Sequence, residues 1–438
     1  MISSPAKDST INPLPPGGDG GRAFFFARQV GRFASVQMLV QLIGFSTGIL
    51  LVRQMAQREY ALFTITNTMQ GTINLLADIG ISIGMVSIGG RVWQDGHRFG
   101  ELVSTGLKLR RKLGTAAVLA VTPLLYYMLM KNGASTLYTA VLIAAVLAAL
   151  FAQLSVGVLE VVPRLRSDIR QIQRIDLTGA LARLAVLGAL TFVFLDAGVA
   201  ALVGSGTLLL QYLLLRRYAA RVIDLQAQEN AEDRKAMVGF IRQQAANAIF
   251  FCLQGQITIL LITVFGHRVG SVAEVGALGR LAMIYSVMAN LIANILAPAF
   301  ARCQEAGRLG RIYAGIVGGV AGFSLLVLAG AAFLPNEFLF VLGNKYAHLQ
   351  RELLLMVGGA TINMLGSTLW TLNASRAWVV GSWVYIPLTI ATQLLLIPFI
   401  DFSSVAGVLT FNLISAFPSL LLNIGLSYRG FLQPIPAT

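Results

Sequence analysis

A stripe of polar side chains runs along one apolar segment, residues 61–88. Asn67, Gln70, Asn74 and Asp78 lie three, four and four residues apart, so on a helix they fall within about 80° of one another. The segment is long enough to cross a bilayer, which takes about 20 apolar residues. A carboxylate facing lipid there would cost about 3 kcal/mol. We therefore expect the stripe to face protein or a water-filled cavity, an arrangement typical of transport proteins.

Three charged residues inside apolar segments each allow two interpretations. Asp78 can cap the bundle or pair with a neighbouring arginine, or it can bind a coupling proton or cation and act as a gate. Arg280 can snorkel outward along its aliphatic stem, or it can be a cavity cation that meets a phosphate through charge-assisted hydrogen bonds. Arg183 lies six residues inside its predicted span, a position that favours snorkelling to the headgroups.

The two halves of the chain resemble each other. A shift of 206 residues places Gln243 and Asn247 over Gln37 and Gln41. Internal repeats with polar groups at their mutual interface are typical of alternating-access transporters. The other explanation is that such amides hold helices together at about 0.6 kcal/mol each. The candidate substrate-binding residues of a shared cavity are Arg280, Gln41, Asn74, Asn247, Asn290 and Asn294.

The composition requires an integral membrane protein. The chain has 438 residues, of which 56% are hydrophobic and 12% charged, whereas a soluble domain carries about 25% charged residues. We predict an all-α polytopic fold with about twelve transmembrane helices in two six-helix lobes. The expected spans are 34–52, 61–88, 113–130, 136–159, 177–195, 197–214, 244–266, 273–299, 313–334, 353–374, 377–400 and 403–427.

The basic residues predict an orientation. Of 33 lysines and arginines, 25 lie in the N-terminal leader and the even-numbered loops, and six lie in the odd-numbered loops. By the positive-inside rule both termini are cytoplasmic, and this distribution explains the net charge without a nucleic-acid partner. We divide the chain into a disordered cytoplasmic leader (1–33), a first six-helix lobe (34–215), a cytoplasmic linker (216–242) and a second six-helix lobe (243–430).

Several kinds of chemistry are not expected. The two cysteines lie in or beside predicted spans, which argues against a disulfide or a metal site. No GxxxxGK[ST] motif occurs, so we expect no ATP hydrolysis and no cofactor. The predicted outer loops are short, which argues against an integral-membrane glycan polymerase or ligase. We therefore expect a transporter rather than an enzyme.

Two stretches of sequence resemble a known family. The run 51–63 (LVRQMAQREYALF), followed by 75–81 (LLADIGI), is similar to the start of polysaccharide-transporter flippases. These belong to the multidrug/oligosaccharidyl-lipid/polysaccharide exporter superfamily, which includes the multidrug and toxic compound extrusion (MATE) proteins. Residues 275–298 look like the eighth span of that family. The resemblance implies a V-shaped, MATE-like pair of lobes around a central cavity gated by spans one, two, seven and eight.

The resemblance also implies a function. The expected substrate is a polyprenyl-diphosphate-linked oligosaccharide, a polysaccharide repeat unit moved across the bacterial cytoplasmic (inner) membrane. The expected partners are membrane lipids, a coupling proton or sodium ion, and other polysaccharide-assembly proteins. Peptidoglycan-precursor flippases of this superfamily carry further cavity arginines where this chain has Gln41, Thr47 and Ile73, which favours an O-antigen or exopolysaccharide unit. The alternatives are a precursor flippase or a small-molecule antiporter of the same superfamily.

Overall fold

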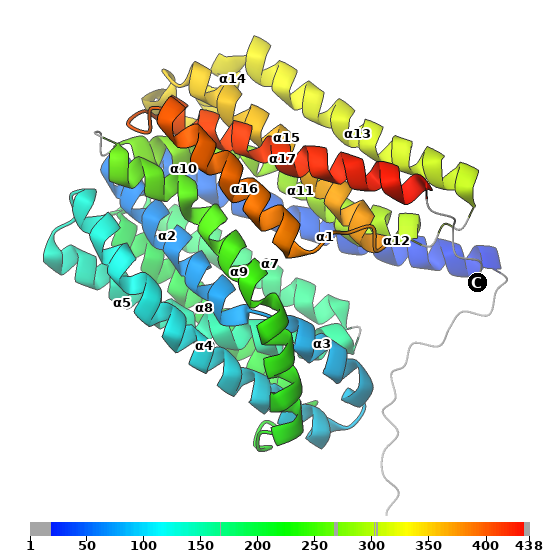
Figure 1. The fold of residues 1–438 in the computed structure, drawn as a ribbon. Coiled ribbons are helices and arrows are strands. Elements are labelled where there is room, and N and C mark those ends of the chain that lie inside the picture. Colours follow the sequence, from blue (N-terminus) through cyan, green and yellow to red (C-terminus); the bar gives the residue numbers. More distant parts are fainter. Residues whose placement is uncertain (1–18, 167, 267–269, 302, 304, 433–438) are drawn as a thin grey trace, which may run out of the picture.

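The computed structural model describes residues 19–166, 168–266, 270–301, 303 and 305–432, and it describes side chains from Ser35 onward except at 294, 306 and 382. Every regular element in this part of the chain is a helix. The first lobe contains α1 to α8 (Figure 1). Its helices are α1 (Asp19–Gln54), α2 (Gln57–Asp78), α3 (Ile81–Val92), α4 (Gly96–Lys131), α5 (Thr136–Leu159), α6 (Val161–Leu165), α7 (Ile169–Leu190) and α8 (Ala197–Ala219).

The second lobe follows a linker over residues 220–230. Its elements are α9 (Ala231–Phe265), α10 (Gly270–Ala282), α11 (Ile284–Leu291), a π-helix η1 (Ile292–Leu296), α12 (Ala297–Ala301), α13 (Ala306–Phe333), α14 (Pro335–Leu342), a 3-10 helix η2 (Asn344–Tyr346), α15 (Gln350–Ser375), α16 (Ser382–Leu396), a 3-10 helix η3 (Ile397–Phe399) and α17 (Val405–Leu432).

The helices agree with the predicted all-α membrane fold of about twelve spans. Among the described residues, eight helices are long and apolar enough to cross a membrane, and two bent pairs bring the number to ten. The shorter apolar helix α16 and the more charged α7 occupy the two remaining predicted positions. The boundaries differ most where helices extend beyond the apolar core, since α4 begins at Gly96 rather than at residue 113.

Two predicted spans are broken. The span 61–88 is split into α2 and α3, which meet at an angle of 45°. Gly80 allows the bend because its φ is +71°, and a Cβ there would lie 2.8 Å from the Phe240 carbonyl carbon of α9. The second bent pair, α10 and α11, meets at 41°. The polar stripe lies entirely in α2, on the N-terminal side of the first bend.

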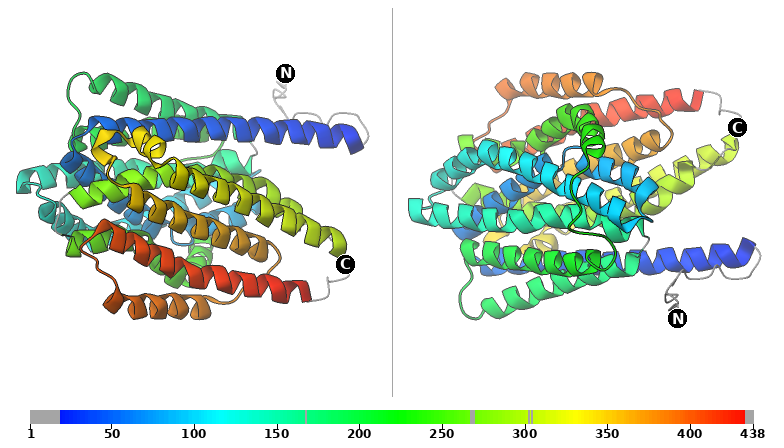
Figure 2. Two further views of the ribbon diagram at one scale, coloured as in Figure 1. Left: turned by 90° about the horizontal axis from the view of Figure 1, so that it is seen from above. Right: turned by 90° about the horizontal axis from the view of Figure 1, so that it is seen from below.

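The start of α1 differs from the predicted leader. The helix begins at Asp19 and includes residues 19–33, which the sequence assigned to a disordered segment. The prolines of the cluster that indicated disorder lie before Asp19, whereas Gly20 and Gly21 are included in the helix. Both views in Figure 2 show the N-terminal part of α1 extending past the other helices of its lobe. Residues 1–18 lie outside the described part of the chain.

Each lobe has its own helix pairs. In the first lobe α5 packs on α8, α2 on α4 and α1 on α7, whereas in the second α15 packs on α17 and on α13. The lobes join through α2 against α10 and through α9 against α2, α3 and α4. The N-terminal part of α9 packs on α3 and α4, and its C-terminal part lies among the helices of its own lobe. α9 therefore connects the two lobes along its length.

The lobes are held together at the end of the bundle that carries α14, which we call the α14 end. Arg53 at the end of α1 donates from Nε to the Val341 carbonyl at 2.8 Å. Lys345 of η2 donates to the carbonyls of Arg53 at 3.0 Å and Met55 at 2.9 Å. Gln57 donates to Glu274 of α10 at 3.3 Å. The opposite end, where the 220–230 linker lies, is called the linker end.

Candidate functional site

A cavity of about 350 Å³ lies in the first lobe and reaches the boundary with the second. We call it the arginine cavity. It is surrounded by α1, α2, α5, α7 and α8, and α10 contributes one side chain. Its polar and charged lining residues are Thr47, Thr66, Asn67, Gln70, Gln153, Asp176, Arg183, Thr207, Gln211 and Arg280.

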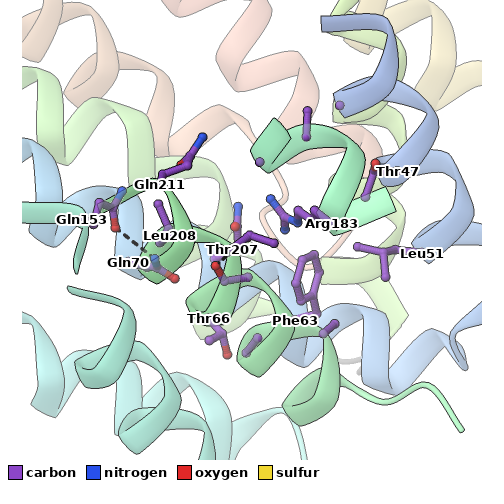
Figure 3. Close-up of a pocket in the computed structure, with 18 of the residues that line it drawn as sticks. Thr47, Leu51, Phe63, Thr66, Gln70, Gln153, Arg183, Thr207, Leu208 and Gln211 are labelled. Carbon is purple, nitrogen blue, oxygen red and sulfur yellow. Dashed lines mark hydrogen bonds between the residues drawn. The ribbon is translucent and has the colours of Figure 1, made fainter. Parts of the chain in front are cut away.

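Arg183 and Arg280 both face this cavity. Arg183 comes from α7 and points into the space drawn in Figure 3. Its Nε is buried and has no hydrogen-bond partner among the described residues. Neither arginine forms an ion pair within the described chain, and because both line one cavity, their like charges repel each other. The site therefore holds two cations whose charge is not matched by direct ion pairing.

The position of Arg183 corrects the sequence interpretation. Its place near the start of a predicted span favoured snorkelling toward the headgroups, but the residue instead lines the cavity. The reason is the packing of α7 (Ile169–Leu190), which lies against both α1 and α8, so that the face carrying Arg183 borders the space between these helices.

Arg280 is held in place by aromatic and backbone groups. Its Nε donates to the hydroxyl of Tyr60 at 3.2 Å, and that hydroxyl donates to the Gly276 carbonyl at 3.4 Å. Its stem lies against α1 at Gly48, where a Cβ would come within 3.1 Å of the Arg280 Cδ. This geometry matches the cavity-cation interpretation of Arg280, and its role toward a substrate remains a prediction.

The polar stripe of α2 divides into two functional halves. Asn67 and Gln70 line the arginine cavity, and Gln70 donates to Gln153 of α5 at 2.9 Å. Asn74 and Asp78 face another way, toward α4. The stripe is a continuous face in sequence, but the helices that surround α2 give its two halves different partners.

Arg110 of α4 is the partner of the second half. Arg110 is 4% exposed. Its Nη1 lies 3.3 Å from the Asp78 carboxylate, and its Nη2 donates to the side-chain carbonyl of Asn74 at 3.1 Å. Ser82 also donates to Asp78, at 2.7 Å. A Cβ at Gly157 of α5 would lie 2.1 Å from the Arg110 Nη1, so only glycine leaves room for this side chain.

This network gives Asn74 a partner within the protein and favours one interpretation of Asp78. Asn74 accepts a hydrogen bond from Arg110 within the first lobe and does not line the arginine cavity, so its role toward a substrate stays a prediction. Asp78 pairs with an arginine, the first of the two alternatives drawn from the sequence. The predicted spans 61–88 and 113–130 leave Arg110 in a loop between them. Because α4 extends to Gly96, Arg110 instead lies on a helix beside α2.

The other predicted amides are not brought together. Gln41 accepts a hydrogen bond from Ser286 of α11 at 3.5 Å. Asn290 is exposed and donates to the Ser286 carbonyl at 2.8 Å, and Asn247 is half-buried in α9. None of these three lines the arginine cavity. The side chain of Asn294 lies outside the described residues.

The sequence analysis missed several lining residues. Gln153 and Gln211 are single amides within otherwise apolar stretches of α5 and α8, and Asp176 is an acidic residue on α7. Gln211 also lies across Gly179 of α7, where a Cβ would be 2.6 Å from the Gln211 Nε2. The sequence offered only one signal for Gln153 and Gln211, namely a single amide in an apolar span. A single amide predicts a polar cavity much more weakly than several polar residues on one helix face.

No protein-family model and no curated protein sequence matches the chain. The structure is similar to the lipid II flippase MurJ in an inward closed conformation, with a TM-score of 0.69 and 10% identity over 91% of this chain and 89% of that one.

Two MATE structures extend this likeness. An inward-facing multidrug resistance MATE transporter of the MOP superfamily matches with a TM-score of 0.63 and 14% identity, over 90% of this chain and 98% of that one. An outward-facing MATE transporter of the same superfamily matches with a TM-score of 0.56 and 15% identity, over 90% and 93%. At these identities the likeness defines the fold alone: the chain has a MATE-like fold, the architecture of MOP-superfamily transporters.

Proposed function

We propose that this protein is a transporter, not an enzyme, that moves a polyprenyl-diphosphate-linked oligosaccharide across the cytoplasmic membrane by alternating access. The observation that carries the proposal is the presence of Arg183 and Arg280 in one cavity, with no ion pair to either within the described chain. The MATE-like fold supports a transport function. The two arginines in the cavity support a negatively charged substrate.

The chemistry of the two arginines fits a diphosphate. Guanidinium groups bind phosphate oxygens through two parallel charge-assisted hydrogen bonds. An unpaired cation in a low-dielectric site is unfavourable until an anion arrives, so a ligand of two or more negative charges relieves the repulsion between the arginines. Asp176 also lines this cavity, so one carboxylate partly offsets the charge of the two arginines.

The contacts between the lobes support an alternating-access cycle. In the structure the polar contacts described above hold the lobes together at the α14 end. By the positive-inside rule we infer that the linker end, near the basic loops, is cytoplasmic. The structure then corresponds to a state closed toward the outside, into which a head group enters from the inner leaflet. Opening of the α14 end would release it on the other side.

A peptidoglycan precursor is the second candidate substrate. The similarity to a lipid II flippase favours it, and the inclusion of Arg183 in the cavity removes part of the sequence argument against it. Both candidates carry the same diphosphate, so they differ only in the glycan or peptide part of the head group. A small cationic drug is disfavoured because two arginines would repel it.

The test is gene deletion and complementation. We expect the deletion to trap lipid-linked oligosaccharide in the inner leaflet and to abolish a surface polysaccharide. Arg183→Gln and Arg280→Gln should each fail to restore it at normal expression, because each leaves the diphosphate with one cation. Arg174→Gln is the matched control, since Arg174 lies exposed on the same helix as Arg183 and should restore export fully.

Two results would contradict the proposal. If no lipid-linked intermediate accumulates and surface polysaccharide is intact, the protein does not flip that substrate. If both cavity variants complement as well as Arg174→Gln, the cavity does not bind the diphosphate. Accumulation of a peptidoglycan precursor instead would select the second candidate.

A further inference from the structure

A second polar cavity lies inside the second lobe. It has a volume of about 410 Å³ and is formed by α9, α15, α16 and α17. We call it the amide cavity. All its lining side chains are uncharged, in contrast to the arginine cavity. Its polar lining residues are Gln254, Thr258, Asn363, Tyr385, Thr389, Gln393, Asn412, Ser415 and Ser419.

Two glutamines form the centre of its hydrogen-bonding surface. Gln254 of α9 donates to Gln393 of α16 at 2.9 Å, and Gln393 donates back to Gln254 at 2.7 Å. Each amide has two N–H donors and two carbonyl lone pairs, and this pair uses one of each. Both amides therefore retain a donor and an acceptor for a ligand in the cavity.

α17 adds further polar groups. The hydroxyl of Ser415 is buried and has no hydrogen-bond partner within the described chain, although it borders the cavity. Asn412 donates to Thr258 at 2.5 Å and keeps its carbonyl oxygen for another donor. A buried hydroxyl without a partner is unfavourable, so a ligand that hydrogen-bonds to it removes that penalty.

An aromatic wall borders the same space. Phe251 and Tyr385 stack with ring centroids 5.9 Å apart and an interplanar angle of 27°, and both line the cavity. Flat apolar faces beside amide and hydroxyl groups suit a ligand with both C–H faces and many hydroxyls. A sugar ring has this combination, since each hydroxyl both donates and accepts.

A third cavity joins the other two. It has a volume of about 360 Å³ and shares Asn67 and Arg280 with the arginine cavity. It shares Thr258, Met356 and Asn412 with the amide cavity. The three cavities therefore form one series across the lobe boundary, with the cations in the first lobe and the neutral polar groups in the second.

We propose that the amide cavity is the subsite for the uncharged sugar residues of the head group, while the arginine cavity holds the diphosphate. This inference rests on the proposed function and assigns the glycan to particular residues, chiefly Gln254, Gln393, Asn412 and Ser415. A hard cation is the competing ligand, but such ions favour carboxylate oxygens, and the lining of this cavity has none.

The test uses the purified full-length chain and two probes. One is a short-chain polyprenyl diphosphate, and the other is the same lipid diphosphate carrying a neutral trisaccharide. We expect the wild type to bind the glycosylated lipid about tenfold more tightly, equivalent to one or two added hydrogen bonds. Gln254→Leu and Asn412→Leu should lose most of that ratio and bind the bare lipid normally, whereas Arg280→Gln should weaken both.

Matched variants keep the test falsifiable. Gln243→Leu is the control, because this exposed amide lies on the same helix as Gln254 but lines none of the three cavities. Ser415→Ala is the mild variant if the leucine variants do not fold, and it should reduce the ratio about threefold. Normal binding of the bare lipid shows that a variant is folded.

Each other outcome overturns the inference. A wild type that binds the bare lipid but shows no preference for the glycosylated one refutes the sugar subsite and leaves the proposed function intact. A wild type that binds neither lipid refutes both. A preference that survives Gln254→Leu and Asn412→Leu places the sugar elsewhere. Stabilisation by sodium that Asn412→Leu abolishes, with no sugar preference, would make this a cation site.

Discussion

The clamp formed by Lys345 at the α14 end offers a direct test of alternating access. Its amine donates to the carbonyls of Arg53 at 3.0 Å and Met55 at 2.9 Å. These carbonyls belong to the last residues of α1 and the turn after it, where helix carbonyls have no intrahelical donor. Lys345 of the second lobe therefore caps the end of α1 in the first lobe. Lys345→Met removes this cap while keeping most of the side-chain volume.

The size of the effect follows from these two bonds. Hydrogen bonds to a charged group contribute about 1.5–3 kcal/mol each, but Lys345 is exposed, so solvent screening lowers the sum to about 1–2 kcal/mol. Because 1.4 kcal/mol corresponds to a factor of ten, we expect the ratio of closed to open α14 ends to fall about 5- to 30-fold. The α14 end should therefore be open in a measurable fraction of molecules.

Spin labels measure this population. After replacement of Cys252 and Cys303, labels at Leu137 and Phe333 would report the separation of the lobes, since these side chains are 78% and 84% exposed at the α14 end. We expect Lys345→Met to add a longer-distance population that is rare in the parent protein.

The control is Arg351→Met, which removes an exposed cation at the same end of the bundle. It should leave the distance distribution unchanged. If Lys345→Met gives the parent distribution, the clamp does not hold the lobes together. If Arg351→Met opens the α14 end to the same extent, the loss of positive charge rather than the loss of the cap is responsible.

Two glycine substitutions test the packing around the arginines. Gly157→Ala places a Cβ 2.1 Å from the Arg110 Nη1, so we expect a loss of about 1–3 kcal/mol from overpacking, read as a lower thermal unfolding temperature; an unchanged temperature would mean that Arg110 has another position. Gly48→Ala crowds the Arg280 Cδ at 3.1 Å and should reduce polysaccharide export severalfold at normal expression. Gly71→Ala, with open space around its Cβ and a position outside the cavity lining, should export normally, and equal export by both variants would show that Arg280 is not positioned by α1.

Much of the fold could be predicted from the sequence because the hydrophobic signal of a membrane helix is local. About 20 apolar residues in a row define a span whatever surrounds them, and α5 begins and ends at the predicted residues. The breaks were harder to predict. Gly80 is one glycine among 44, and only the nearby backbone of α9 shows why a bend lies there.

The candidate site could be predicted only in part. Arg280, Asn67 and Gln70 stood out because polar residues are costly in a span, and all three line the arginine cavity. Asn74 and Asp78 gave the same signal but bind Arg110 instead. A polar face on a helix shows that a partner exists, but it does not distinguish a substrate from another side chain.

The sequence by itself therefore determined that this is a membrane helix bundle with polar groups inside it, since burial of charge in lipid is excluded by its free energy. Only the tertiary structure decided which of these groups meet. It placed Arg183 and Arg280 in one cavity, joined the second half of the stripe to Arg110, and gathered uncharged amides from α9, α16 and α17 into another cavity. The physical reason is that pairing depends on helix ends, bends and close approaches at glycine, which hydropathy along the chain does not record.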